Sequence, residues 1–252
     1  MATRLILTLL ALWPAVLMAQ PKRPAGPAPV LARELIIRQN DMALDWYWRA
    51  APEVGLEPNL LRAMRGEALA SADKARILAR KDMTQAQSAG FPFRKHEYWT
   101  GWTVEADAGR LLVLLGRSWQ YTGGAHGNTG HAGRLWDRQA GRSIGIETLF
   151  SDWPRVRRLI EPAYCAALEA ERRRRRGADR LMDAFETCPP LAEQLILPAA
   201  APVERVARQV RIVLDPYVAG PFSEGSYELT MAWPEGVAAM VAAPWRDALG
   251  LD

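Results

Sequence analysis

The densest glycine cluster of the chain lies at residues 121–133, where the sequence reads YTGGAHGNTGHAG. Five of these thirteen residues are glycine, and two of the chain's three histidines lie among them. Glycine accepts positive φ angles and close backbone approach, so this density predicts a tight corner. The apolar run at residues 111–115 enters the corner, and residues 134–137 leave it. The stretch therefore predicts two strands joined by a glycine corner.

Several short matches around this corner resemble a known family. They are YTGGAHG at 121–127, Trp136-Asp137, a turn at 140–142, Ile144, Ile146, Leu149-Phe150 and, more loosely, the turn-rich segment 215–225 with the strand after it. They resemble a bacterial extracytoplasmic domain of unknown function. That domain forms the outer part of RsiV-type lysozyme-sensing anti-sigma factors and accompanies the catalytic module of PdaC-type peptidoglycan deacetylases.

The resemblance covers roughly residues 90–233. It implies an α+β fold and, as partners, a lysozyme-like protein or peptidoglycan itself. We expect neither a sigma-binding segment nor a deacetylase module in this chain.

Residues 1–19 have the character of a secretory signal peptide, with Arg4 followed by an apolar stretch and then Leu17-Met18-Ala19. A membrane span needs about 20 apolar residues, and Pro14 interrupts a shorter one here. We expect cleavage after Ala19, no transmembrane anchor and a soluble periplasmic protein. Residues 20–30 contain four prolines and predict an extended leader.

The charge balance is only mildly basic. The formal net charge is +4, and removal of residues 1–19 removes Arg4 and leaves +3. Binding to nucleic acid usually requires a concentrated basic face, so together with export this balance argues against a nucleic-acid partner. It also gives no global steering toward a basic lysozyme, for which a local acidic patch would be needed.

The two cysteines, Cys165 and Cys188, predict one disulfide because the chain is expected to be exported. A bridge closing a loop of this length stabilises a fold by about 3 kcal/mol in the chain-entropy model. A reactive thiol and metal ligation are the alternatives, and neither cysteine has a nearby histidine or second cysteine at metal-ligand spacing.

Hydrophobic periodicity and turn residues predict an α+β fold, an antiparallel sheet flanked by helices, one of them long and tied by the disulfide. The expected helices are 31–50, 67–89, 154–177 and 244–249, and the expected strands are 94–106, 110–121, 134–137, 143–146, 206–214 and 226–233. We expect two lobes, an N-terminal one at 31–115 and a C-terminal one at 116–252 that carries the corner.

Five consecutive arginines, Arg172–Arg176, end the long helix. Cations at a helix C-terminus interact favourably with the helix dipole, by about 0.3–1 kcal/mol where exposed. A solvated helix end is the plainer interpretation, and a docking patch for an anionic wall polymer or lipid is the alternative.

His126 is expected to fix the corner by hydrogen bonds from its ring nitrogens to backbone groups. Tyr121 would then pack its ring and place its hydroxyl on a nearby carbonyl. Asn128 and His131 are expected farther out, and they are the better candidates for contact with a partner. The full set of candidate binding residues is Tyr121, Gly123, Gly124, His126, Asn128 and His131.

Catalytic arrangements around the corner are weaker. His126 and His131 could share a metal with Asp137, but their spacing matches no recognised site. Ser118, Thr122 or Thr129 could act as a nucleophile with His126, but no nucleophile elbow surrounds any serine. We expect no metal, no other cofactor and no catalytic residue.

The tryptophans offer a further clue, because Trp99, Trp102, Trp119 and Trp136 lie on the strands around the corner. Most should be buried, and one or two exposed ones could stack on sugar rings or form a protein hot spot. The sequence thus predicts a non-catalytic recognition protein of the cell envelope. The alternative is a metal-assisted hydrolase of envelope glycan.

Overall fold

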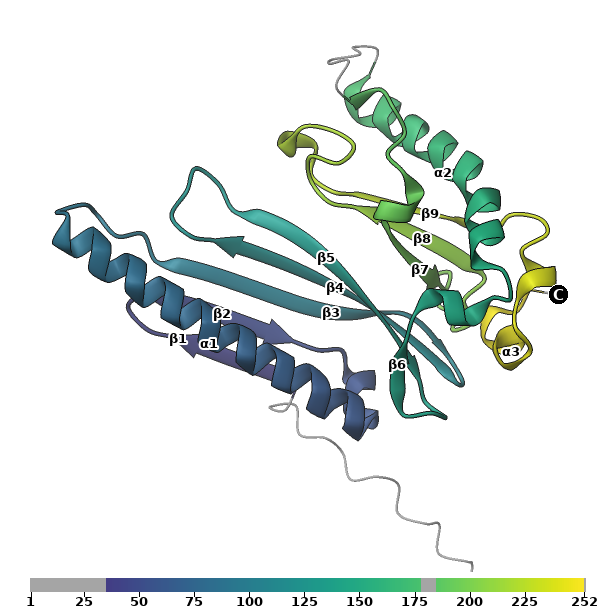
Figure 1. Cartoon of the computed structure of the whole chain (residues 1–252), viewed down its shortest axis with the longest axis horizontal. Helices are drawn as coiled ribbons and strands as arrows, with labels where there is room; N and C mark the ends of the chain where they lie inside the picture. Colours follow the sequence, from purple (N-terminus) through teal and green to yellow (C-terminus); the bar gives the residue numbers. More distant parts are fainter. Residues whose placement is uncertain (1–34, 178–184, 252) are drawn as a thin grey trace, which may run out of the picture.

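The computed structural model describes residues 35–177 and 185–251. Two sheets organise it, one of six strands in the order β1-β2-β3-β4-β5-β6 and one of three in the order β7-β8-β9. Helix α1 crosses one face of the larger sheet, and the smaller sheet with α2 outside it lies on the other side (Figure 1). This architecture confirms the predicted α+β class.

The strands are β1 Ile36–Asn40, β2 Leu44–Arg49, β3 His96–Ala108, β4 Leu111–Tyr121, β5 Asn128–Asp137, β6 Arg142–Ile144, β7 Leu195–Ala199, β8 Gln209–Leu214 and β9 Tyr227–Ala232. The helices are α1 Pro58–Ser88, α2 Trp153–Arg176 and α3 Arg246–Leu249. Short 3-10 turns are η2 Pro52–Leu56, η3 Ile146–Leu149, η5 Leu191–Glu193, η6 Phe222–Glu224, η7 Ala238–Met240 and η8 Ala243–Trp245.

The predicted helix at 31–50 is wrong for its described part, because residues 36–49 form the hairpin β1–β2. Trp46 and Trp48 are buried while Tyr47 is half-buried, which is the period of a strand. The aromatic and apolar positions near helical spacing were misleading here. Strand β2 then pairs in parallel with β3, and α1 makes the crossover between them.

Helix α1 begins at Pro58, nine residues before the predicted start at Glu67. Leu60, Leu61 and Met64 continue its buried stripe, which then becomes a row of alanines: Ala68, Ala72, Ala75 and Ala79. Small side chains at these positions allow the helix to approach the sheet closely. The helix ends before Gly90, whose φ of +70° confirms the predicted cap.

The apolar run at residues 111–115 lies in β4, where all five side chains are fully buried. Leu112 and Leu114 belong to the core beneath α1, and Leu111, Val113 and Leu115 belong to the core shared with the smaller sheet. A strand covered on both faces is apolar at every position. The predicted two-lobe division near residue 115 stays a prediction, and it would fall within this shared strand.

The smaller sheet contains one strand that the sequence did not predict. Strand β7 includes Pro198, a residue type that is depleted in strands. It lies at the edge of that sheet, paired only with β8, and an edge strand is where proline is tolerated. The other two strands of this sheet, the hairpin turn at Gly141 with φ of +62°, and the closing helix were predicted within a few residues.

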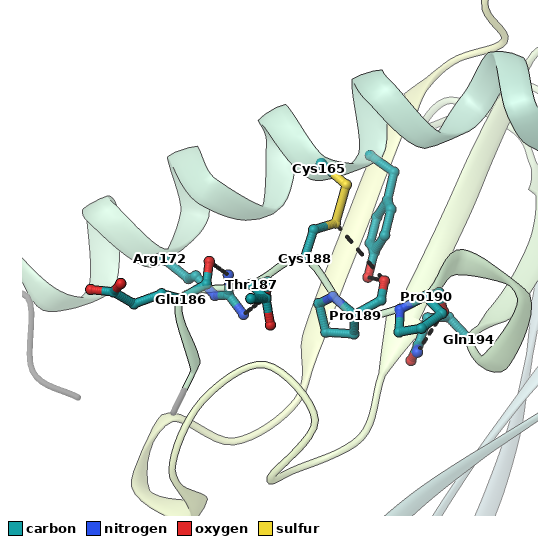
Figure 2. Close-up of a disulfide and its surroundings, with 9 residues drawn as sticks. Cys165, Arg172, Glu186, Thr187, Cys188, Pro189, Pro190 and Gln194 are labelled. Atoms are coloured by element: carbon teal, nitrogen blue, oxygen red, sulfur yellow. Dashed lines mark hydrogen bonds between the residues drawn. A yellow bond between two sulfur atoms is a disulfide. The ribbon is translucent and has the colours of Figure 1, made fainter. Parts of the chain in front are cut away.

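The disulfide between Cys165 and Cys188 is present, with 5.6 Å between the two Cα atoms. It ties the segment that begins at residue 185 to the middle of α2, as Figure 2 shows. Beside it, the buried Tyr164 hydroxyl donates a hydrogen bond of 3.1 Å to the carbonyl of Pro189. The predicted tether of the long helix is therefore confirmed.

The arginine run is not simply a solvated helix end. Arg172 is 4% exposed, and its guanidinium donates a hydrogen bond of 3.0 Å to the carbonyl of Ala219. It also donates to the carbonyls of Glu186 and Thr187, at 3.4 and 3.1 Å (Figure 2). Arg176 forms an ion pair of 2.7 Å with Glu224. These contacts hold two irregular segments against the helix.

The other three arginines also have intramolecular partners. Arg174 and Arg175 pair with Glu171, and Arg173 pairs with Glu169. An anionic polymer would have to compete with these carboxylates, which weighs against the docking-patch interpretation.

Among the described residues, no helix combines the length and apolar character that a membrane span requires. The predicted signal peptide and the proline-rich leader lie outside these residues.

Candidate functional site

The glycine corner is a bend of residues 122–127 between β4 and β5. Gly123 has a φ of +92°, a conformation that favours glycine. A Cβ at Gly127 would overlap the indole of Trp119, so this position also requires glycine. The predicted corner is confirmed, but it is shorter than expected because β5 already begins at Asn128.

His126 lies in the corner and is exposed to solvent. Its Nδ1 lies 2.9 Å from the carbonyl oxygen of Gly127, a backbone contact of the expected kind. Its ring stacks on Phe222 with 3.9 Å between centroids, and its Nε2 lies 3.5 Å from the hydroxyl of Tyr217. The first corner thus contacts the second turn-rich segment, 215–225, rather than standing alone.

Tyr217 has a φ of +71°, which is unusual for a residue other than glycine. The surrounding turn holds it there, and its ring lies 5.6 Å from Phe222. The two corners therefore meet through three rings, those of His126, Tyr217 and Phe222. Neither sequence periodicity nor spacing indicated this contact, because the segments are about 90 residues apart.

Tyr121 differs from its expected role. Its hydroxyl accepts a hydrogen bond of 3.0 Å from Nη1 of Arg94, not one directed at a carbonyl. Its ring lies nearly parallel to that of Trp119, with 6.3 Å between centroids. The expected packing is present, but the long Arg94 side chain from the segment before β3 reaches the hydroxyl.

His131 was expected far out, and this is wrong because its side chain is 2% exposed. Its Nδ1 lies 2.6 Å from Asp215, and its Nε2 lies 3.8 Å from Glu228. The alternation of β5 directs this side chain toward the smaller sheet. His131 therefore supports the second corner from below, while Asn128 is exposed at the start of β5.

A network of charged side chains continues from His131 between the two sheets. Arg117 donates two hydrogen bonds to Glu228, of 2.9 and 2.6 Å, and Arg211 lies 2.9 Å from Glu228 and 2.8 Å from Glu105. The hydrogen bonds from Arg117 hold the pKa of Glu228 below its usual range. Burial raises the pKa of Glu105.

This network borders a cavity of about 820 Å³. Its lining includes Glu105, Arg117, Arg211 and the segment 200–205. Sequence reasoning missed the network because its members come from four different strands. The only local signal was charge within otherwise apolar strands, at Arg117 after the leucine run and at Arg211 within β8.

The third histidine, His96, lies beneath α1 and is 1% exposed. Its Nε2 lies 3.3 Å from the carboxylate of Asp82, and burial lowers the pKa of the imidazole. It faces the opposite side of the sheet from His131 and takes no part in the corner.

The residues of the alternative, catalytic interpretation do not converge. Asp137 is bound by Arg110 through two hydrogen bonds of 2.8 and 2.6 Å at the far end of β5, and Arg110 holds its pKa below the usual range. The hydroxyl of Ser118 donates to the carbonyl of Gly130 at 3.0 Å. Within residues 35–177 and 185–251, no three His, Cys, Asp or Glu side chains gather as metal ligands. No observation therefore favours the metal-assisted hydrolase.

An open row of aromatic side chains crosses the larger sheet beside the corner. Tyr47 of β2 pairs with Trp99 of β3, and Trp99 pairs with Trp119 of β4. Trp99 is 38% exposed, and a cavity of about 260 Å³ lies over the row. Of the four tryptophans around the corner only Trp136 is buried, fewer than expected, and Trp102 lies half-buried on the opposite face.

These features define the class of protein as an α+β fold whose two sheets are joined by an ion-pair network and by two touching corners. No protein-family model and no curated protein matches the sequence.

Solved structures do match the fold. A DUF3298 family protein from Bacteroides fragilis is similar with a TM-score of 0.54 at 15% identity, covering 84% of this chain and 94% of that one. A DUF3298 family protein from Pseudomonas aeruginosa PAO1 has a TM-score of 0.50 at 16% identity, covering 79% and 84%. The similarity is to a bacterial domain of unknown function, as the resemblance implied, and at these identities it establishes the fold alone.

Proposed function

We propose that the protein is an exported, non-catalytic recognition protein of the bacterial cell envelope that binds peptidoglycan or a lysozyme-like protein. The observation that carries the proposal is the pair of corners held together by His126, Tyr217 and Phe222. Loops fixed on a rigid sheet are where recognition residues usually lie. A preformed surface of this kind loses little conformational entropy on binding.

Export is supported by two independent features. Residues 1–19 have the sequence of a signal peptide. The disulfide between Cys165 and Cys188 is typical of proteins that fold in an oxidising compartment, such as the periplasm.

The proposed binding surface consists of Tyr121, Gly123, Gly124, His126 and Asn128. These residues are exposed or half-buried on the corner and at the start of β5. His131 has a different role in this proposal, because its buried imidazole positions the second corner through Asp215. It would therefore affect binding without touching the ligand.

The experiment is a pulldown of the full chain with purified peptidoglycan sacculi and, separately, with immobilised lysozyme. We expect retention on at least one of them and a loss of about tenfold in affinity for the double variant His126→Ala and Asn128→Ala. Ile77→Ala, at a 71% exposed position on α1, is the matched control and should bind normally. Retention on neither material would reject the proposal. Equal binding by the double variant would reject the corner as the binding surface.

A further inference from the structure

The aromatic row of Tyr47, Trp99 and Trp119 lies on the face of the larger sheet opposite α1. Trp46 and Trp48, the neighbours of Tyr47, point into the core beneath α1, so Tyr47 points the other way. Directly paired residues of adjacent strands share a face. The three rings therefore form one continuous surface across β2, β3 and β4.

Glycines next to the row allow both indoles to lie along the sheet. A Cβ at Gly101 would lie 2.7 Å from the six-membered ring of Trp99, and a Cβ at Gly127 would overlap the indole of Trp119. Each indole thus takes the space that a side chain would otherwise occupy over the backbone. One face of Trp99 rests on the strand, which leaves the other side of the ring as its exposed part.

Polar groups surround the rings. The cavity of about 260 Å³ over the row is lined by Tyr47, Trp99, Trp119, Tyr98, Arg38, Asp45 and Glu97. Arg38 and Asp45 form an exposed ion pair of 3.7 Å. In the described part of the chain, the carboxylate of Glu97 and the indole N–H groups of Trp99 and Trp119 have no hydrogen-bond partner. Donors and acceptors are thus available around an aromatic floor.

We propose that this row is a binding site for a neutral glycan chain. A pyranose ring has C–H groups on its faces and hydroxyls at its edges, so it can stack on an indole and bond to flanking carboxylates at the same time. Because Asp45 is paired with Arg38, Glu97 leaves the lining with one unbalanced negative charge, which disfavours a phosphate, sulfate or uronate by charge repulsion. The cavity is slightly smaller than the about 300–1,000 Å³ usual for small-molecule sites, which suits one or two sugar rings.

The inference rests on the proposed envelope role in one respect, because that role identifies the glycan as the N-acetylhexosamine backbone of the cell wall. The row adjoins the corner, since Trp119 lies against Gly127. A glycan strand on the row would therefore extend toward His126, and the row would determine which wall component the corner surface meets.

The test uses the full chain and a soluble probe, the β-1,4 tetramer of N-acetylglucosamine, with binding measured by calorimetry. We expect Trp99→Ala to weaken this binding by at least about tenfold. Trp99→Phe, which keeps an aromatic face, should weaken it only a few-fold. Phe91→Ala removes a 70% exposed aromatic ring that does not line the cavity and is the matched control. Polygalacturonate, an acidic polysaccharide, should not bind.

A second measurement does not depend on the variants folding. Titration of the wild-type chain with the same tetramer should shift the indole N–H resonances of Trp99 and Trp119 in an NMR spectrum and leave that of Trp153 unchanged. The same titration with the cellulose tetramer, which lacks N-acetyl groups, distinguishes two kinds of ligand. Binding of the N-acetylglucosamine tetramer alone indicates a site for wall glycan, and equal binding of both tetramers indicates a general glycan site.

Failure of this inference and failure of the proposed function are distinguishable. If the wild type and Trp99→Ala bind sacculi equally and neither binds the tetramer, the glycan site is overturned and the envelope role stands. If Trp99→Ala loses the tetramer binding of the wild type, but the wild type is retained on neither sacculi nor lysozyme, the site is supported and the envelope role is overturned. Tetramer binding unaffected by Trp99→Ala would also overturn the site.

Discussion

The three histidines lie at or next to strands of one sheet, yet each has different surroundings. His126 is exposed on the corner and stacks on Phe222, whereas the side chains of His131 and His96 are almost fully buried on opposite faces of the sheet. Strand alternation determines which residues share a face of the sheet. It does not determine which face is covered by another element. This coverage decides whether an imidazole contacts solvent or a carboxylate.

At this scale, the corner makes a sharp prediction about Gly127. A methyl group there would overlap the indole of Trp119, so we expect Gly127→Ala to lower the free energy of unfolding by about 1–3 kcal/mol. Gly66→Ala is the matched control, since it adds the same methyl to open space within α1 and should raise stability by up to about 1 kcal/mol. Denaturant unfolding of both variants measures the difference. Equal effects of the two substitutions would contradict the close packing of Trp119 on the corner.

At the scale of single elements, α2 shows how far local sequence goes. Its predicted bounds, 154–177, agree with the structure to within one residue at each end, and the side chain of Asp152 caps it by accepting a hydrogen bond from the N–H of Arg155. The disulfide was predicted from cysteine count and expected compartment. The roles of Arg172 and Arg176 were not predicted, because all their partners lie outside the helix: Glu186 and Thr187 are 14 and 15 residues away from Arg172, and Ala219 and Glu224 are more than 40 residues away.

The same helix predicts a pH dependence through Glu171. Arg174 and Arg175 lower the pKa of this carboxyl from 4.5 to about 2. A carboxyl with a lowered folded pKa stabilises the fold above its ordinary pKa, and this contribution is lost as the pH falls toward about 2. We therefore expect Glu171→Gln to cost on the order of 1–2 kcal/mol at pH 7 and almost nothing near pH 2.

Urea unfolding at several pH values measures this difference. Glu169→Gln is the control, because its pair with Arg173 is 3.4 Å long and largely exposed, and its removal should change stability little. A cost for Glu171→Gln that stays constant between pH 7 and pH 2 would contradict the ionic origin of the effect.

At the scale of the whole molecule, β4 is the element that both cores share. Its alternate side chains enter the core beneath α1 and the core beneath the smaller sheet. The ion pairs of Arg117 and Arg211 with Glu228, and the contact of the two corners, add further connections between the sheets. Unfolding one core would therefore expose half of the strand on which the other depends.

This sharing predicts one cooperative unfolding transition. Leu112→Ala and Leu115→Ala, one from each core, should each cost about 2–5 kcal/mol. Each variant should shift the far-UV circular dichroism and tryptophan fluorescence curves together. Leu69→Ala, at a 42% exposed position, should change stability by less than about 0.5 kcal/mol. Two separate transitions, only one of them shifted by Leu112→Ala, would instead support two independent lobes.

The sequence by itself determined the features that depend on neighbouring residues: the glycine corner, the hairpin of β3 and β4, the long capped helix and the disulfide. Their causes are local, namely backbone freedom, periodicity and residue chemistry. The tertiary structure alone decided that residues 36–49 form strands, that His131 is buried against Asp215, that four strands contribute one ion-pair network and that Tyr47 joins Trp99 and Trp119 in a row. These depend on strand register and on which face each element covers, and both are set by contacts between residues far apart in the chain.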